Sequence, residues 1–299
     1  MVEKKPNFIV VGAMKAATTS LYTYLKQHPE IFMTKVKEPM FFNNFKQENK
    51  YKISGKKSKK PTTLKEYLAM FDDVKNEKAI GEASPAYIYN PQAPQLIKEH
   101  LSNVKIIAIL RQPTDRAYSN YLHTKRADRE DAATFQEAIE LENKRIKDNW
   151  SPLYHYIEKG YYSVQLKRYF DLFSEKNIKI YLFEDVVKNT KETLKDIFKF
   201  LEVDENVEID TSKKANVSGN PSGLMGWVLK KMRYYNLMPK FAISYYLPKF
   251  IMELIFKSVY KPIEKLNEDS RRDITERYYK GEIRSLEKLI DRDLSSWLS

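Results

Sequence analysis

The sequence predicts an α/β fold with a parallel β-sheet, flanked by helices on both faces, and a helical C-terminal region. Two observations predict it. Short apolar runs such as Phe8–Gly12 and Lys105–Leu110 have the character of buried strands, and they alternate with stretches of helical periodicity. The first run leads directly into a turn of small residues and then a helix, as in P-loop-like proteins.

The turn after the first strand has the chemistry of an anion site. The turn and the helix start contain Lys15, Ala16, Ala17, Thr18, Thr19 and Ser20. The first amides of a helix lack intrahelical acceptors and carry partial positive charge, so a phosphate is the expected ligand. Thr18 occupies the position of the lysine in the nucleoside-triphosphatase pattern. This disfavours an ordinary ATP or GTP loop. A P-loop kinase is kept as an alternative, as is a corner that binds no ligand.

A second candidate site follows the strand at 105–110. Arg111 stands at the end of this strand, where ligands bind in open α/β sheets. Pro113 and Asp115 favour a helix start, which places Ser119 about two turns into the helix. Arg111 and Ser119 can then converge on one anion. The alternative is that Arg111 forms a structural ion pair and Ser119 is an ordinary helix residue.

The whole chain is predicted to form one domain, 1–299, with a core at 6–220 and a helical extension at 221–299. Its remaining predicted elements are helices near 64–71, 92–101, 134–147, 161–174 and 190–201, and strands at 79–83 and 178–183. The lysine-rich segment 45–61 is predicted to be a linker or a lid. Residues 224–260 mix aromatic residues with lysines, which suits core packing, an acceptor cleft or peripheral contact with an anionic membrane.

Composition favours anionic partners and no metal. The net charge is +12, the chain has no cysteine, and its 4 histidines lack metal-ligand spacing. No apolar leader or spanning segment is evident, so a cytoplasmic location is expected.

The two phosphate-binding segments together resemble sulfotransferases that use 3′-phosphoadenosine 5′-phosphosulfate (PAPS). Lys15–Leu21 is similar to the family's Lys-x-Gly-Thr-Thr-Ser-Leu loop, which holds the 5′ phosphosulfate. Arg111, Pro113 and Ser119 are similar to its second motif, which holds the 3′ phosphate. Ala17 replaces the usual glycine. A Cβ is tolerable there only if φ is negative and the phosphate does not crowd it.

The resemblance extends to the branch that modifies glycans, including the heparan sulfate enzymes. Lys37–Phe42 is similar to its Glu-x-x-Phe-Phe segment, which implies that Glu38 is the general base. A surface ion pair of Glu38 with Lys35 or Lys37 is the alternative. His123, four residues after Ser119, is the rival base.

Three further segments resemble the family. Glu82–Tyr87 is similar to the branch's Glu-x-[Ser/Thr]-Pro-x-Tyr segment, with Ala83 where some members carry a catalytic lysine. A helix near 161–169 and a late loop at 213–219 also match. These two imply further nucleotide contacts from Tyr161, Lys214, Asn216, Ser218 and Gly219.

The resemblance implies sulfuryl transfer from PAPS to an acceptor hydroxyl, on a carbohydrate or glycolipid, without a metal and with adenosine 3′,5′-bisphosphate as product. Lys125, Arg126 and Arg129 are candidates to contact an anionic acceptor. The alternatives are a P-loop kinase using ATP and a non-catalytic module that binds a nucleotide or another anion; nucleic acid is not an expected partner.

Overall fold

The structure is a computed structural model that describes residues 4–45, 60–101, 103–212, 219–221, 260–262 and 265–299. The chain divides into two compact units, residues 1–215 with 267–299, and residues 216–266. The domain boundary predicted at 220 stays a prediction. Most of the segments predicted at 45–61 and 224–260 lie outside the described residues.

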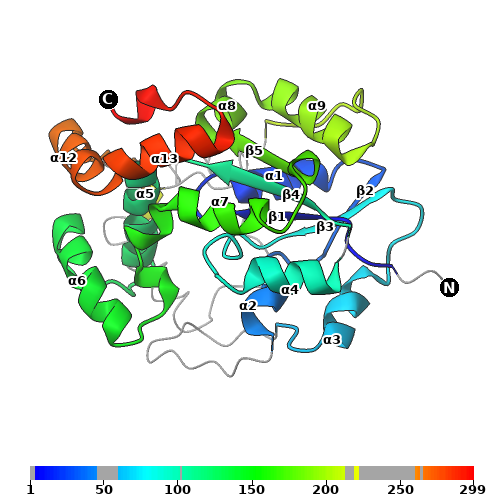
Figure 1. Cartoon of the computed structure of the whole chain (residues 1–299), viewed down its shortest axis with the longest axis horizontal. Helices are drawn as coiled ribbons and strands as arrows, with labels where there is room; N and C mark the ends of the chain where they lie inside the picture. The colour runs from blue at the N-terminus through cyan, green and yellow to red at the C-terminus, as the bar shows by residue number, and fades with distance from the viewer. Residues whose placement is uncertain (1–3, 46–59, 102, 213–218, 222–259, 263–264) are drawn as a thin grey trace. The chain divides into compact units, whose positions relative to one another are not determined.

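The first unit is built on a five-stranded parallel sheet with helices packed around it (Figure 1). Its strand order is β2-β3-β1-β4-β5. The strands are β1 (Phe8–Gly12), β2 (Ile31–Met33), β3 (Ala79–Ala83), β4 (Lys105–Leu110) and β5 (Ile178–Leu182). β1 and β4 are almost entirely buried and have the continuous apolar sequences of central parallel strands. The predicted α/β class is therefore confirmed.

The helices alternate with the strands along the chain. The α-helices are α1 (Thr18–Leu25), α2 (Phe41–Asn44), α3 (Leu64–Leu68), α4 (Ala93–His100), α5 (Pro113–Arg126), α6 (Phe135–Lys147), α7 (Tyr162–Phe170), α8 (Phe183–Lys188), α9 (Thr190–Leu201), α12 (Glu268–Ile274) and α13 (Lys280–Ile290). A π-helical turn, Thr275–Tyr279, joins the last two. Short 3₁₀ turns lie at Ala69–Phe71, Pro152–Tyr154, Glu158–Gly160, Glu175–Asn177 and Ser295–Trp297. In the second unit, β6 (Gly219–Pro221) pairs antiparallel with β7 (Tyr260–Pro262).

Two predicted boundaries are wrong, for local reasons. The helix predicted over 161–174 ends at Phe170, because the chain turns there and the buried Phe173 folds back onto Tyr169, with ring centroids 6.1 Å apart. The strand predicted to include Phe183 ends at Leu182, and Phe183 begins α8. The other predicted helices and strands are found within one or two residues.

The C-terminal helices pack against the start of α5. The buried Gln112 side chain caps α5 by accepting from the Asp115 amide at 2.7 Å, and it donates to the Thr275 hydroxyl at 3.0 Å. Arg271 of α12 forms an ion pair with Asp115 at 3.1 Å. These contacts fix the turn that follows Arg111.

Candidate functional site

Four segments of the candidate site follow strands that lie side by side. β1 lies between β3 and β4, and β2 lies on the far side of β3, all parallel. The segments after them begin at Ala13, Ser84, Arg111 and Thr34, so they leave the sheet at the same edge. In open α/β sheets this edge binds ligands. The topology therefore brings both predicted phosphate-binding motifs and Glu38 to one region.

The turn after β1 has the geometry of an anion cradle. Lys15 and Ala17 both adopt left-handed backbone conformations, with φ of 70° and 63°. Within the described parts of the chain, no backbone carbonyl accepts from the amides of Ala17, Thr18 or Thr19. These are the amides that precede the first intrahelical bond, Leu21 to Ala17 at 3.0 Å. The condition that Ala17 keep a negative φ is not met, so this residue pays a steric cost that glycine would avoid.

The second motif lies directly against this turn. Arg111 Nη1 donates to the Lys15 carbonyl at 3.3 Å, and the guanidinium lies over the Phe183 ring, 4.7 Å from its centroid. The Tyr162 hydroxyl donates to the Arg111 carbonyl at 3.0 Å. Burial lowers the pKa of Arg111, and no carboxylate of the described segments forms an ion pair with it. A half-buried guanidinium in this state suits an anionic ligand, as a 3′ phosphate would be.

The side chain of Lys15 is strongly perturbed. Its pKa falls from 10.5 to about 8, chiefly because the amine is desolvated, and Arg126 and Arg111 add positive charge. The carboxylate of Glu38 opposes this decrease. A bound phosphate would oppose it further, since a negative charge favours the protonated amine. Lys15 thus lies where it can neutralise charge on a phosphate.

Glu38 stands at the rim of the same region. It accepts from Lys37 Nζ, and its side chain is 39% exposed. Lys35 pairs instead with Asp73, at 2.5 Å. One of the two predicted surface pairs therefore forms. It does not remove Glu38 from the site, because its charge also acts on Lys15 and Lys60.

His123 shares this environment. Its pKa is lowered to about 4, first by desolvation and then by the positive charges of Lys15, Arg126 and Arg129. A proton on His123 would add another positive charge to this group. The imidazole is therefore a weaker base than an ordinary histidine.

For the other predicted nucleotide contacts the structure gives only a position, or nothing. Ser119 lies half-buried on α5, two turns after Arg111 as predicted. The Tyr161 ring packs 5.8 Å from that of Tyr279, while its neighbour Tyr162 contacts Arg111. Lys214, Asn216 and Ser218 lie outside the described residues, and Gly219 begins β6 of the second unit.

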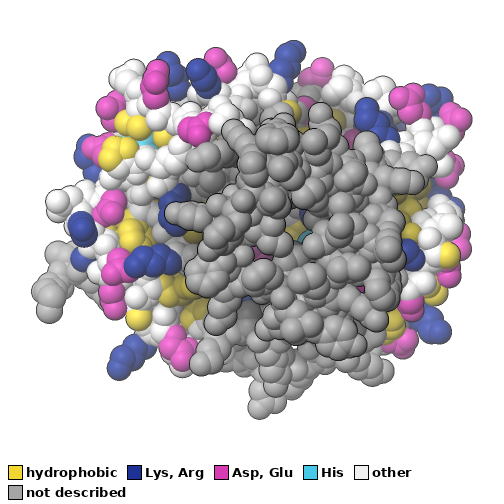
Figure 2. All heavy atoms as spheres, turned by 180° about the vertical axis from the view of Figure 1, so that it is seen from behind, with side chains coloured by type: hydrophobic (Ala, Val, Ile, Leu, Met, Phe, Trp, Pro, Cys, Tyr) yellow, Lys and Arg dark blue, Asp and Glu magenta, His cyan; other side chains and the backbone are white. Residues whose placement is uncertain are grey.

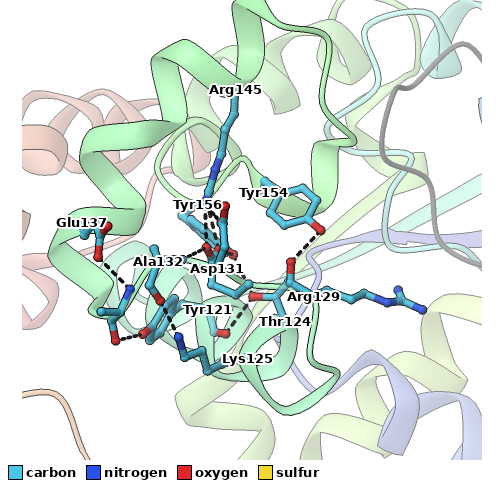
Figure 3. A network of polar contacts seen from close by, with 12 residues as sticks. Tyr121, Thr124, Lys125, Arg129, Asp131, Ala132, Glu137, Arg145, Tyr154 and Tyr156 are labelled. Atoms are coloured by element: carbon cyan, nitrogen blue, oxygen red, sulfur yellow. Dashed lines mark hydrogen bonds and ion pairs between the residues drawn. The ribbon is translucent and has the colours of Figure 1, made fainter. Parts of the chain in front are cut away.

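The end of α5 and the loop after it are held by a buried polar network (Figure 3). Arg145 binds Glu130 at 2.6 and 3.0 Å and Asp131 at 2.5 Å. Lys125 is part of this network, because its amine donates to the Ala132 carbonyl at 2.5 Å. Figure 3 shows the side chain of Arg129 extending away from the network. Of the three predicted acceptor contacts, Lys125 thus has a structural partner, and so has Arg126, whose Nε donates to the Leu122 carbonyl at 3.1 Å.

Charges of both signs are spread over the described surface. Figure 2 shows Lys and Arg side chains interspersed with Asp and Glu around one face. In the described residues no group of three potential ligands could hold a metal ion. No helix in those same segments is long and apolar enough to cross a bilayer.

Two structural features near Glu38 were not predicted from the sequence. Lys60 has a lowered pKa, mainly through burial, and is close enough to Glu38 and Glu82 for their charges to act on it. Glu82 is fully buried and accepts hydrogen bonds from three hydroxyl groups. A carboxylate inside the apolar strand 79–83, followed by Ser84 and Tyr87, was a readable signal for such a network.

Comparisons with known proteins identify one family. The family described as "Sulfotransferase domain" matches residues 5–241. A solved sulfotransferase from Alicyclobacillus acidocaldarius is 29% identical, covers 99% of both chains and has a TM-score of 0.77. The membrane-associated sulfotransferase kil1 of Dictyostelium discoideum is 39% identical over 39% of this chain and 22% of its own length. Bifunctional heparan sulfate N-deacetylase/N-sulfotransferase 4 of Mus musculus is 28% identical over 66% of this chain and 22% of its own length.

The chain spans less than a quarter of the length of these two curated relatives. The family match covers most of the chain. It begins before β1 and extends beyond α9. This protein belongs to the sulfotransferase family.

Proposed function

We propose that this protein transfers a sulfuryl group from PAPS to a hydroxyl of a carbohydrate or glycolipid, with Glu38 as the general base. The observation that carries the proposal is the hydrogen bond from Arg111 to the Lys15 carbonyl, which joins the two phosphate-binding motifs at adjacent strand ends. One adenosine donor with phosphates at its 5′ and 3′ positions can reach both motifs at once.

The proposed donor binds by charge and by amide hydrogen bonds. The amides of Ala17–Thr19 and the Lys15 amine face the 5′ phosphosulfate, and Arg111 with Ser119 holds the 3′ phosphate. Tyr161 and the loop residues Lys214, Asn216, Ser218 and Gly219 belong to the same proposal. During transfer, the bond between sulfur and the phosphate oxygen breaks, and negative charge grows on the leaving phosphate. Fixed amides and Lys15 stabilise that charge.

The acceptor hydroxyl loses its proton as its oxygen bonds to sulfur. Glu38 takes this proton, since its carboxylate is a proton acceptor within range of the Lys15 charge. His123 is less suited, because desolvation first, and then the charges of Lys15, Arg126 and Arg129, lower the pKa of its imidazole to about 4. The glycan acceptor rests on relatives such as the heparan sulfate enzyme, and on the match of residues 37–42 to that branch.

The test is incubation with ³⁵S-labelled PAPS and a panel of oligosaccharides, polysaccharides, glycolipids and small phenols. Label in a carbohydrate or glycolipid product, with release of adenosine 3′,5′-bisphosphate, is the expected result. Label confined to phenols would contradict the acceptor class. Absence of transfer together with Mg²⁺-dependent turnover of ATP would favour a kinase instead.

A further inference from the structure

Glu82 is a buried carboxylate held by hydroxyl groups alone in the described part of the chain. It lies in β3 and is fully buried. It accepts from the Ser84 hydroxyl at 2.6 Å, the Tyr87 hydroxyl at 2.8 Å and the Tyr67 hydroxyl at 3.2 Å. Burial raises its pKa to about 7, and the three hydroxyl donors oppose that increase. Above neutral pH it is therefore ionised and can only accept hydrogen bonds.

Two of these hydroxyls also hold the backbone of residues 37–42, which we call the Glu38 segment. The Met40 amide donates to the Ser84 hydroxyl at 3.0 Å, and the Phe42 amide donates to the Tyr87 hydroxyl at 3.4 Å. A hydroxyl has one proton, and here that proton points at Glu82. Its lone pairs are then left for the backbone amides. The carboxylate thus sets the direction of both hydrogen bonds.

The Glu38 segment needs such support because its backbone is strained. Glu38 and Met40 have φ of 57° and 55°, left-handed conformations that disfavour any residue with a Cβ. Conformations of this kind persist only where the surroundings over-determine them. Aromatic packing adds to the support. The Phe41 ring stacks on Tyr67 with centroids 4.6 Å apart, and the Phe42 ring meets Tyr87 at 5.5 Å.

We propose that Glu82 is a positioning residue for sulfuryl transfer. It orients the Ser84 and Tyr87 hydroxyls so that they bind the Met40 and Phe42 amides, and it thereby keeps Glu38 in range of Lys15. This inference rests on the proposed role of Glu38 as the base. Glu82 itself does not touch the acceptor, since its side chain is enclosed by Tyr67, Ser84 and Tyr87.

The chain offers matched variants for a test. Glu82→Gln places an amide group against the hydroxyls, and Ser84→Ala removes the acceptor of the Met40 amide. Tyr67→Phe is the control, because it removes one hydrogen bond to Glu82 but none to the Glu38 segment. Turnover and the affinity for adenosine 3′,5′-bisphosphate are measured at alkaline pH, where Glu82 is ionised.

We expect Glu82→Gln and Ser84→Ala to lower kcat by up to ~100-fold, the scale of a catalytic group misplaced by about 1 Å. Bisphosphate affinity stays within about twofold of the wild-type value, because the phosphate sites are not changed. The double variant falls little below either single variant, since both act through the same hydrogen bonds. Tyr67→Phe keeps turnover near the wild-type value. A parallel loss of turnover and bisphosphate affinity in Glu82→Gln would mean a merely structural role and would overturn the proposal.

Amide hydrogen exchange gives a readout that does not need an active enzyme. The Met40 and Phe42 amides should exchange faster in Glu82→Gln than in the wild type, while amides of β1 and β4 keep their protection. Unchanged exchange at Met40 and Phe42 would refute the positioning role, whatever the turnover. If the wild type transfers label to no acceptor, the proposed function fails, and the exchange data still decide whether Glu82 holds this segment.

Discussion

The turn before α1 contains a residue that its own backbone conformation disfavours, and Ala17→Gly should relieve this strain. Ala17 precedes α1 with φ 63° and ψ 13°, a left-handed conformation. This conformation destabilises a residue with a Cβ by about 1–2 kcal/mol. Glycine loses more conformational entropy on folding than alanine, by about 0.5–1 kcal/mol. The difference predicts that the variant is more stable by up to about 1.5 kcal/mol.

The assay is equilibrium denaturation in urea, with Ala16→Gly as the matched control. Ala16 is fully buried and is not among the residues of positive φ, so the same substitution should destabilise the protein there. The opposite signs at two adjacent alanines separate strain from a general effect of glycine. An Ala17→Gly variant that is less stable than the wild type, or that matches Ala16→Gly, would refute the reasoning.

Two further predictions concern the base and a buried lysine. Glu38→Gln should lower the transfer rate by ~10²–10⁴-fold, the usual contribution of a general base, and leave the affinity for adenosine 3′,5′-bisphosphate intact in calorimetry; loss of both would indicate a structural role. Lys159 is buried, and desolvation first, then the charge of Arg116, lowers its pKa from 10.5 to about 7. Between pH 7 and 10.5 Lys159 is protonated in the unfolded chain and neutral in the folded one. Its destabilisation of the fold is therefore greatest below pH 7 and disappears as pH rises through 10.5. Lys159→Met should therefore stabilise the fold by up to about 5 kcal/mol below pH 7 and by little at high pH; a gain that does not change with pH would contradict this assignment.

The strands, and the place of both proposed phosphate-binding motifs at strand ends, were predictable because their signals are local. The apolar runs at 8–12 and 105–110 and the residues just after them identify both motifs without any tertiary information. The three-residue strand β2 is too short to produce a pattern. The helix α8 begins inside what was predicted as a strand, because Phe183 leaves the sheet to lie against Arg111.

The site's supporting contacts were not predictable, because they join residues far apart in the sequence. Ser84 meets Met40 across 44 positions, and Tyr162 meets Arg111 across 51. Strand order decides both contacts, and the sequence does not state that β1 lies between β3 and β4. The left-handed conformation of Ala17 is likewise imposed by the turn, against the residue's own preference.

The central claim is that one donor bridges the Lys15 turn and Arg111, and paired ligands test it most directly. Calorimetry would compare adenosine 3′,5′-bisphosphate with adenosine 5′-phosphate, which lacks the 3′ phosphate, on the wild type and on Arg111→Gln. The variant should bind the bisphosphate ~10–100-fold more weakly, the scale of charged hydrogen bonds, while its affinity for the monophosphate changes little. If wild type and variant distinguish the two ligands equally well, Arg111 does not hold the 3′ phosphate and the bridging site is wrong.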